Sequence, residues 1–449
     1  MQRTHILLLA LLAAARPAFA KTWIVAKDGS GDFTQVQPAI DAAQPGDVIV
    51  VREGTYGRIM VTKGVAIVGV GIGRTIIQQP GGDGHDALGV TAVPKVQRTI
   101  VANLTLEATS IAWVYESPGT FVCHRVELKG QPWDGSWGYN LASWHSGPTF
   151  VDQCYTTEST DDPNWWYYKG TGGFHAKNAT MSVVNCQSYP PQQDFLLDGS
   201  PAFRVYDSGT LFLAESTGTG GIGATGFYGG AYCEQMTPGG RGGAGAFVGD
   251  GCDAIVAGRA HLLRGGEGGP GGKNGYCSGM GEGGPGGDGV RVEGSGAALV
   301  SNIVAEGAPG GHGDPDGAPG VPYFGNVMPA PTPLPTSLMS GSSTIGGDFT
   351  LTFYGATGDQ VLLVISDQVG VVKVKGTDGF PLMAIPGGFF AARPLGAIDS
   401  SGQLALVFPI PSDERLRGYA VFAQGIVTSP TLAHPPQITN LSLSVIAEP

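Results

Sequence analysis

Aromatic side chains concentrate between residues 133 and 168, where the chain holds five of its seven tryptophans. The flat face of an aromatic ring can pack against a sugar, while neighbouring polar groups bond the hydroxyls. The alternative is that these rings only pack long loops against the body of the fold. The composition favours a sugar-binding surface built from Trp133, Trp137, Tyr139, Trp144, His145, Trp165, Trp166 and Tyr167.

Residues 24–77 indicate which elements must position this surface. A short helix at 36–43 is followed by β runs at 48–51, 59–61 and 65–68, separated by Gly, Pro and Asp. Strands this short cannot bury a face alone and must stack on neighbours, as in a solenoid. We therefore expect an all-β chain built mainly from stacked coils.

The motifs of this stretch also follow a known order. They are the DGSGDF turn at 28–33, the AIDAA helix at 39–43, the PGD turn at 45–47 with its IVV strand, and the GTY turn at 54–56. This order resembles the N-terminal cap of pectinesterases and other right-handed parallel β-helices of the pectin-lyase-like superfamily. The resemblance covers about the first eighth of the chain. It implies a right-handed parallel β-helix and says little about activity.

A second stretch resembles pectinesterases and bears on catalysis. His145-Ser146-Gly147, Phe150 and Cys154-Tyr155 match the family's HSG-x-x-F-x-x-x-CY strand. The resemblance implies a nucleophilic aspartate seven residues beyond the cysteine, which is Asp161 here. The family's Gln-Asp pair, which serves the oxyanion hole and the acid/base step, is missing after Tyr139. The essential downstream Arg segment is missing as well.

Ester hydrolysis of this kind needs a nucleophile, an acid/base and oxyanion donors together. Asp161 is therefore the one candidate catalytic residue, and its alternative is a loop carboxylate before Pro163. The sequence favours engagement of an extracellular or cell-wall polysaccharide without an intact pectinesterase site. A divergent pectinesterase-like esterase or lyase, and a non-catalytic structural surface protein, stay open as alternatives.

Apolar strand runs recur along the chain and mark successive coils. They predict one stacked strand each at 99–106, 120–128, 149–155, 181–186, 210–214, 254–260 and 297–304. The β-helix is thus expected to span residues 21–326.

A sharper repeat lies in the region 218–320, where most of the 75 glycines gather. Tyr232-Cys233 recurs as Tyr276-Cys277, and the double-glycine runs that start at Gly239 and Gly283 recur at the same offset of about 44 residues. We expect the glycines to permit close backbone approach and positive φ in stacked turns. Equivalent positions should stack, with the Cα atoms of Cys233 and Cys277 about 4.8 Å apart. The alternative is a disordered glycine-rich linker.

Export is predicted by the first twenty residues. Arg3 precedes an apolar run, and Ala18-Phe19-Ala20 fits a cleavage site before Lys21. A secreted or cell-surface location allows disulfides among the six cysteines. A buried ladder of free thiols is the alternative for Cys123, Cys154 and Cys186, because they recur on successive coils.

The formal net charge of −12 argues against nucleic acid and anionic membranes as partners. It also disfavours a polyanionic substrate unless a local basic groove exists. No later segment is long and apolar enough to insert into a membrane. The oligomeric state is left unknown.

Cofactor and metal motifs are weak, and we expect neither a cofactor nor a metal. The run 283–291 fits the calcium nonapeptide once, and that motif works only in tandem. Asp314-Pro315-Asp316-Gly317 is more typical of a turn than of a calcium loop. The cysteine spacing does not suit zinc, and no phosphate loop is present.

Beyond the coils, residues 327–343 are rich in Pro and Ser and predict an extended, poorly packed linker. Residues 344–449 contain short β runs separated by turn signals, which predicts a small β-sandwich. The expected β runs are 349–354, 361–365, 380–385, 404–408, 419–423 and 441–446.

Overall fold

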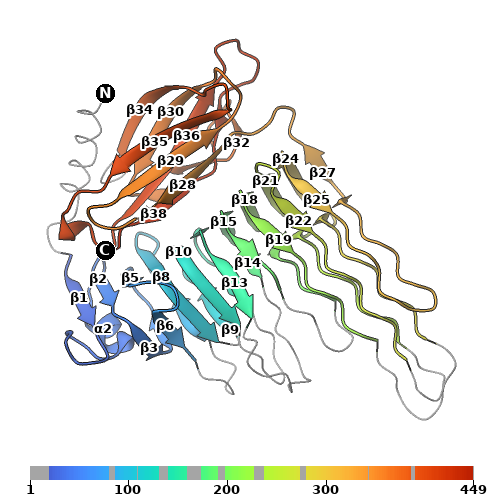
Figure 1. The fold of residues 1–449 in the computed structure, drawn as a ribbon, viewed down its shortest axis with the longest axis horizontal. Helices are drawn as coiled ribbons and strands as arrows, with labels where there is room; N and C mark the ends of the chain where they lie inside the picture. The colour runs from blue at the N-terminus through green and yellow to red at the C-terminus, as the bar shows by residue number, and fades with distance from the viewer. Residues whose placement is uncertain are drawn as a thin grey trace.

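The computed structural model describes residues 20–79, 86–108, 110–130, 140–158, 173–190, 198–226, 237–273, 280–341, 343–385 and 390–447. These residues form a right-handed parallel β-helix, and an antiparallel C-terminal domain lies along its side (Figure 1). The all-β architecture predicted from the sequence is confirmed.

The N-terminal cap closes one end of the β-helix. Helix α2, Val36–Ala42, buries Val36, Ala39 and Ile40 against the first coil. The cap strands match the predicted β runs within one residue: β2 (Val48–Val51), β4 (Ile59–Val61) and β5 (Ala66–Gly69). They are accompanied by β1 (Thr22–Val25), β3 (Gly54–Gly57) and β6 (Thr75–Gln78).

The recurrent apolar runs stack as one parallel row of the large sheet, which we call sheet A. The pairing from each strand to the next confirms the prediction of one coil per run. The row continues from β5 through β8 (Arg98–Ala108), β10 (Thr120–Gly130), β12 (Thr149–Asp152), β15 (Thr180–Val184), β18 (Thr210–Ala214), β21 (Asp253–Ala257), β24 (Ala297–Ser301) and β27 (Val327–Pro329).

Each coil then bends sharply into a second row of sheet A. The bend residues are left-handed, with φ between 50° and 54°, at Asn103, Arg125, Gln153, Asn185, Glu215 and Asn302. Asn tolerates this conformation better than most residues. The second row holds the C-terminal halves of β8 and β10, then β13 (Tyr155–Glu158), β16 (Gln187–Ser188), β19 (Thr217–Thr219), β22 (Leu262–Arg264) and β25 (Val304–Glu306).

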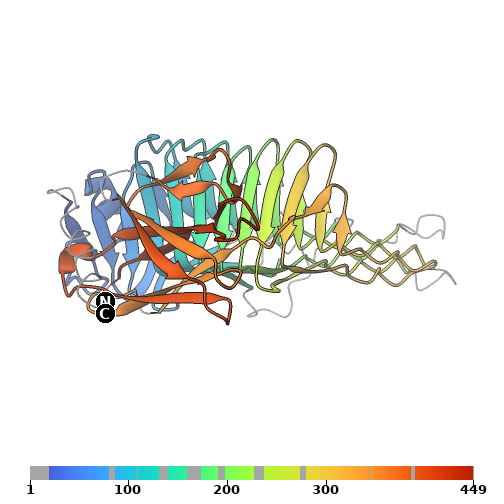
Figure 2. The ribbon, with the colours of Figure 1, turned by 90° about the horizontal axis from the view of Figure 1, so that it is seen from above.

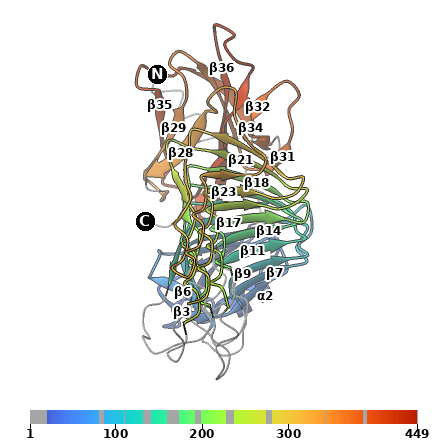
Figure 3. The same cartoon turned by 90° about the vertical axis from the view of Figure 1, so that its right-hand side faces the viewer.

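A second sheet, sheet B, completes the wall, and of its strands only β4 was predicted from the sequence. Figure 3 shows several of its parallel strands stacked one above another. After β4 its order is β7 (Asp86–Thr91), β9 (Ser110–Tyr115), β11 (Leu141–Trp144), β14 (Phe174–Lys177), β17 (Phe203–Tyr206), β20 (Ala246–Val248), β23 (Val290–Val292) and β26 (Tyr323–Phe324).

The interior of the coils is a continuous apolar stack. Phe174 and Phe203 occupy equivalent positions on neighbouring coils, and their rings stack 5.8 Å apart. Cys123, Cys154 and Cys186 belong to the same core as free thiols, with the first two Sγ atoms 3.7 Å apart. The thiol-ladder alternative is therefore correct for these three. Cys233 and Cys277 lie outside the described residues.

The glycine-rich region forms straight extended threads that project from the coils (Figure 2). We call residues 220–226, 237–245, 265–272, 280–289 and 307–320 the glycine bundle. N–H donors recur every third residue and bond the next coil at 2.9–3.0 Å, from Gly239 to Glu282, Gly242 to Pro285 and Gly245 to Asp288. This three-residue period is that of a polyproline-II-type helix.

The bundle is cross-linked on a second side as well, since Gly240 and Gly243 donate to Ala224 and Gly221 at 2.8 Å. Within the described residues this region is thus ordered, contrary to the linker alternative. Close approach explains the glycines: a Cβ on Gly242 would lie 1.8 Å from the carbonyl oxygen of Gly266. The expected positive φ occurs in the turns of this region at Gly251, with 67°, and Gly294, with 57°, whereas none of the described residues of the bundle has a positive φ.

The predicted linker 327–343 differs from the structure at both ends. Residues 327–329 form β27 on the last coil, and β28 (Thr336–Gly341) already belongs to the C-terminal domain. The cause is hydrogen bonding with neighbours far away in sequence, which a Pro- and Ser-rich composition does not disclose. The extended connection between the two strands is therefore only about half a dozen residues long.

The C-terminal domain is a β-sandwich with a core of its own. One antiparallel sheet contains β28, β29 (Asp348–Tyr354) and β35 (Gln403–Pro409). The facing sheet contains β32 (Asp378–Gly379), β37 (Gln437–Ile438), β36 (Ala420–Thr428), β30 (Gln360–Ser366), β34 (Phe390–Ala397) and β38 (Ser442–Val445). A small ribbon of β31 (Val369–Val372) and β33 (Leu382–Ala384), and a 3-10 turn at Glu414–Leu416, complete it.

This domain covers the outer face of sheet A. Val122, Phe150 and Phe212 point outward from the coils and pack against it, and the Phe212 ring lies 6.4 Å from Phe380. Both faces of these strands are therefore buried, which explains their continuous apolar runs. A buried pair, His124 and Asp152, lies on this face with Nδ1 2.9 Å from Oδ2.

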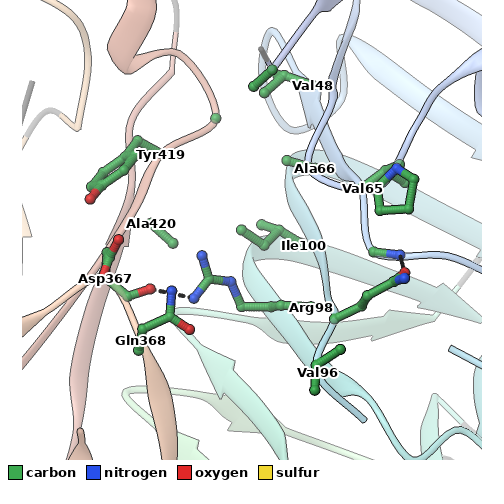
Figure 4. Close-up of a pocket in the computed structure, with 16 residues that line it drawn as sticks. Val48, Val65, Ala66, Val96, Arg98, Ile100, Asp367, Gln368, Tyr419 and Ala420 are labelled. Carbon is green, nitrogen blue, oxygen red and sulfur yellow. Dashed lines mark hydrogen bonds between the residues drawn. The ribbon is translucent and has the colours of Figure 1, made fainter. Parts of the chain in front are cut away.

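A cavity of about 350 Å³ remains between the two domains near the N-terminal cap (Figure 4). The Arg98 side chain points into it from the β-helix, and its Nη1 donates to the carbonyl oxygen of Asp367 at 2.5 Å. The same guanidinium lies 5.2 Å from the centre of the Phe422 ring. Arg98 thus ties the coils to the domain that covers them.

Candidate functional site

The outer face of sheet B carries aromatic rings and cations in two rows that run across the coils. Because side chains alternate along a strand, the apolar residues of each short strand enter the core and the others face outward. The pairing register places the outward residues of successive strands opposite one another. The first row is Trp113, Ala142, His175, Arg204, Phe247, Arg291 and Phe324, and the second is Tyr115, Trp144, Lys177 and Tyr206.

A cluster of rings occupies the N-terminal end of this face. The Trp113 ring lies 5.1 Å from Tyr115 and 5.6 Å from Trp144, and about a third of Trp113 is exposed. Tyr115 in turn meets the His145 ring edge-on at 6.5 Å. Such an exposed, mutually supported cluster offers flat apolar faces that lose little rotamer freedom on binding.

Cations and rings alternate over the following coils. Lys177 lies 5.5 Å from the Trp144 ring and 5.7 Å from the Tyr206 ring. The Arg204 guanidinium lies 4.5 Å from Tyr206 and 5.2 Å from Phe247. The ring contacts orient each cation, and Lys177 also forms an ion pair with Asp207, its Nζ 3.5 Å from Oδ2.

Arg204 and Arg291 differ in how their charges are matched. Arg291 binds Asp288 at 2.9 Å and Glu293 at 2.8 Å. Burial disfavours its charge, but hydrogen bonds to Glu293 and Asp288 more than offset this and raise the pKa of Arg291. Arg204 forms no ion pair with any described carboxylate, and its buried Nε has no hydrogen-bond partner among the described residues.

A cavity of about 360 Å³ opens beside Arg204 where sheet B meets the glycine bundle. Its polar walls contain both signs of charge, so a ligand there could meet acceptors as well as donors. The charged and aromatic lining residues are Asp198, Arg204, Arg241, Phe247, Asp288, Arg291 and Glu293.

Two of the sequence-predicted site residues lie at this face. Trp144 ends β11 within the ring cluster. His145 follows it in the bend, with a φ of 50°, and its Nδ1 lies 3.1 Å from the Asn178 amide nitrogen. The other predicted residues lie outside the described residues, and their roles stay predictions: Trp133, Trp137, Tyr139, Asp161, Trp165, Trp166 and Tyr167.

Sequence reasoning missed most of the two rows. The signal that could have found them is the alternation in short segments such as FHAK at 174–177 and FRVY at 203–206. Each has inward apolar residues and an outward cation or ring. With only four residues per segment, the pattern is too short to stand out without the register.

Carboxylates that could suggest calcium have other partners. Asp288 accepts the N–H of Val321 at 2.8 Å and pairs with Arg291. Asp316 accepts the N–H of Gly313 at 2.9 Å and contacts His312, as expected of a turn. No cluster of three metal-ligating side chains occurs in the part of the chain that the structure describes. No helix among the described residues is long and apolar enough to cross a membrane.

Comparison with solved structures returns a pectate lyase and viral proteins at low identity. The pectate lyase Pel9A shares 13% identity over 65% of this chain and 80% of its own, with a TM-score of 0.32. Tailspike protein 2 of bacteriophage CBA120 shares 10% identity over 92% of this chain and 73% of its own, with a TM-score of 0.30. The ORF18 protein of Geobacillus virus E2 shares 9% identity over 94% of this chain and 76% of its own, with a TM-score of 0.25.

These similarities concern the fold alone. No protein-family model matches the chain, and no curated protein does. The strand pairing itself defines the class, which is the right-handed parallel β-helix.

Proposed function

We propose that the protein engages an extracellular polysaccharide along the outer face of sheet B. Successive strands of a sheet are about 4.8 Å apart, so this face offers a ladder of evenly spaced contacts. A long, repetitive ligand is suited to a repetitive surface of this kind. The exposed ring cluster at Trp113 supplies stacking faces, and the cavity beside Arg204 supplies polar groups.

The observation that carries the proposal is the alternation of Lys177 and Arg204 with aromatic rings on the outer side of sheet B. Arg204 has no carboxylate partner among the described residues, so its charge can meet an acidic substituent of the glycan. A guanidinium binds a carboxylate through two parallel N–H donors. Arg204 would be the cation through which a chain of charge −12 binds an acidic polysaccharide.

A glycan array that contains acidic and neutral polysaccharides tests the proposal. We expect the full chain to bind an acidic polysaccharide, with binding reduced by Arg204→Ala. Arg415→Ala is the matched control, because it removes an exposed arginine from the C-terminal domain. Absence of binding to every glycan, or equal binding by both variants, would contradict the proposal.

Catalysis through Asp161 is a separate question that the same material can address. Without the Gln-Asp pair and the downstream Arg, we propose that Asp161→Asn leaves sugar binding largely intact. Trp165→Ala combined with Trp166→Ala should weaken it, if these rings join the face. Methanol release from esterified pectin and unsaturated products from pectate measure turnover, and activity abolished by Asp161→Asn would favour the esterase alternative.

A further inference from the structure

The PGD turn of the N-terminal cap contains a carboxylate that accepts three N–H groups. Asp47 is 4% exposed. Its Oδ1 accepts the backbone N–H of Lys21 at 2.8 Å, and its Oδ2 accepts the N–H of Gln44 at 2.9 Å and the Trp23 indole at 3.1 Å. Asp47 forms no ion pair with any described residue, so a buried negative charge is matched only by neutral donors.

The donor on Lys21 is the atom that processing would change. Ala18-Phe19-Ala20 fits a cleavage site directly before it. Hydrolysis of the Ala20–Lys21 bond adds one water: Ala20 keeps the new carboxylate, and the Lys21 nitrogen becomes an α-ammonium. A peptidase that selects small residues at the first and third positions before the bond would carry this out.

We propose that this bond is the processing site and that the new α-ammonium of Lys21 forms an ion pair with Asp47. The hydrogen-bonded nitrogen is already in place, so the pair forms without rearrangement. A charge-assisted hydrogen bond is about twice as strong as a neutral one. Cleavage therefore supplies the cation that the buried carboxylate lacks in the uncut chain.

The surrounding contacts hold Lys21 at this position. The carbonyl oxygen of Lys21 accepts the N–H of Val48 at 2.9 Å, and β1 pairs with β2 from Thr22 onward. The Lys21 ammonium group lies 3.1 Å from the centre of the Trp23 ring. The first strand of a solenoid lacks a preceding coil, and the ion pair would anchor it. This inference is independent of the proposed polysaccharide.

The test begins with the N-terminus of the exported full chain, which mass spectrometry should place at Lys21. The α-amino group is then labelled at pH 7 with an amine-reactive ester, and labelling of the N-terminal peptide is followed over time. An ion pair raises the pKa of the α-amino group and so favours the unreactive ammonium. A tenfold drop in the proportion of the free amine slows labelling about tenfold. We expect Asp47→Asn to accelerate labelling of the α-amino group by about that factor.

Asp41→Asn is the matched control, because Asp41 is exposed on α2 and its carboxylate bonds Gln37. A chain made to begin at Ala18 provides a second comparison should Asp47→Asn fail to fold. Its α-amino group should label at the rate of an unfolded peptide. A mature N-terminus elsewhere overturns the inference. Equal labelling rates of the α-amino group in the parent and in Asp47→Asn overturn it as well. So does a chain that begins at Ala18 and whose α-amino group labels as slowly as that of the parent.

Discussion

The guanidinium of Arg204 lies 4.5 Å from the centre of the Tyr206 ring on the same outer face of β17. The two residues are separated by Val205, which enters the core of the coils. This alternation follows from the period of a β-strand and recurs on the neighbouring coils with other rings and cations. A stack of short strands thereby presents a continuous face of charge and aromatic surface.

The glycine bundle should not tolerate a single added methyl group at its centre. Gly242→Ala would place Cβ 1.8 Å from the carbonyl oxygen of Gly266, on a neighbouring thread whose backbone cannot retreat alone. Overpacking of this kind typically costs about 1–3 kcal/mol. We expect faster proteolysis within the bundle and a lower Tm. Gly57→Ala is the control, because a Cβ there meets nothing within 4 Å, and equal proteolysis of the two variants would contradict the packing described.

Docking of the C-terminal domain should weaken in acid through Glu215. Burial disfavours the Glu215 charge, but bonds from His261, Thr336 and Arg259 more than offset this and lower its pKa. A carboxyl whose folded pKa is lowered contributes stability that is fully present above its unfolded value near 4.5. That contribution is lost as the pH falls through the folded pKa.

Glu215→Gln tests this pH dependence. At pH 7 the variant should lose about 3 kcal/mol, as expected when one partner of a buried ion pair is removed. The difference in Tm between variant and parent should narrow below pH 4.5. The control Glu267→Gln, at an exposed position, should have the Tm of the parent both at pH 7 and below pH 4.5. A difference that stays constant from pH 7 to pH 3 would show that the Glu215 charge does not hold the domain.

The buried thiols should be chemically silent in the native protein. The thiolate is the reactive form, and burial raises the pKa of the Cys186 and Cys252 thiols. Burial opposes the Cys154 charge, but hydrogen bonds with Cys123 and Cys186 more than offset this and lower the pKa of Cys154. Its protection therefore rests on its 1% exposure. We expect Cys123, Cys154, Cys186 and Cys252 to resist alkylation at pH 8 and to react fully in denaturant without reductant. Peptide mass spectrometry locates the labels. Rapid native labelling, or disulfide-linked peptides among these four, would contradict the structure.

The β-helix could be predicted from the sequence because the apolar composition of several of its segments indicates strands. The strands of sheet A are apolar on both faces, since the C-terminal domain covers the side that the core does not, and they match the predicted runs closely. Residues 390–397 escaped prediction as β34 because Pro394 and three alanines weaken the pattern, and pairing with β30 decides the strand. Long-range pairing likewise placed β28 within the predicted linker.

The candidate site was predictable only in part. Trp144 and His145 were found because tryptophans near them are dense in the sequence. Arg204 and Lys177 were not, because a single cation in a four-residue segment has no meaning until the register brings it beside a ring. Trp144 belongs both to the surface predicted from the sequence and to the second row on sheet B.

The most direct test of the account is the affinity of the full chain for the acidic polysaccharide that the array selects, measured by titration calorimetry. The account predicts that Arg204→Ala and Trp113→Ala each weaken binding about tenfold, corresponding to roughly 1–2 kcal/mol per contact. Arg415→Ala should bind as the parent does. Unchanged affinity in both sheet B variants, with their folds intact, would contradict the claim that this face binds the glycan.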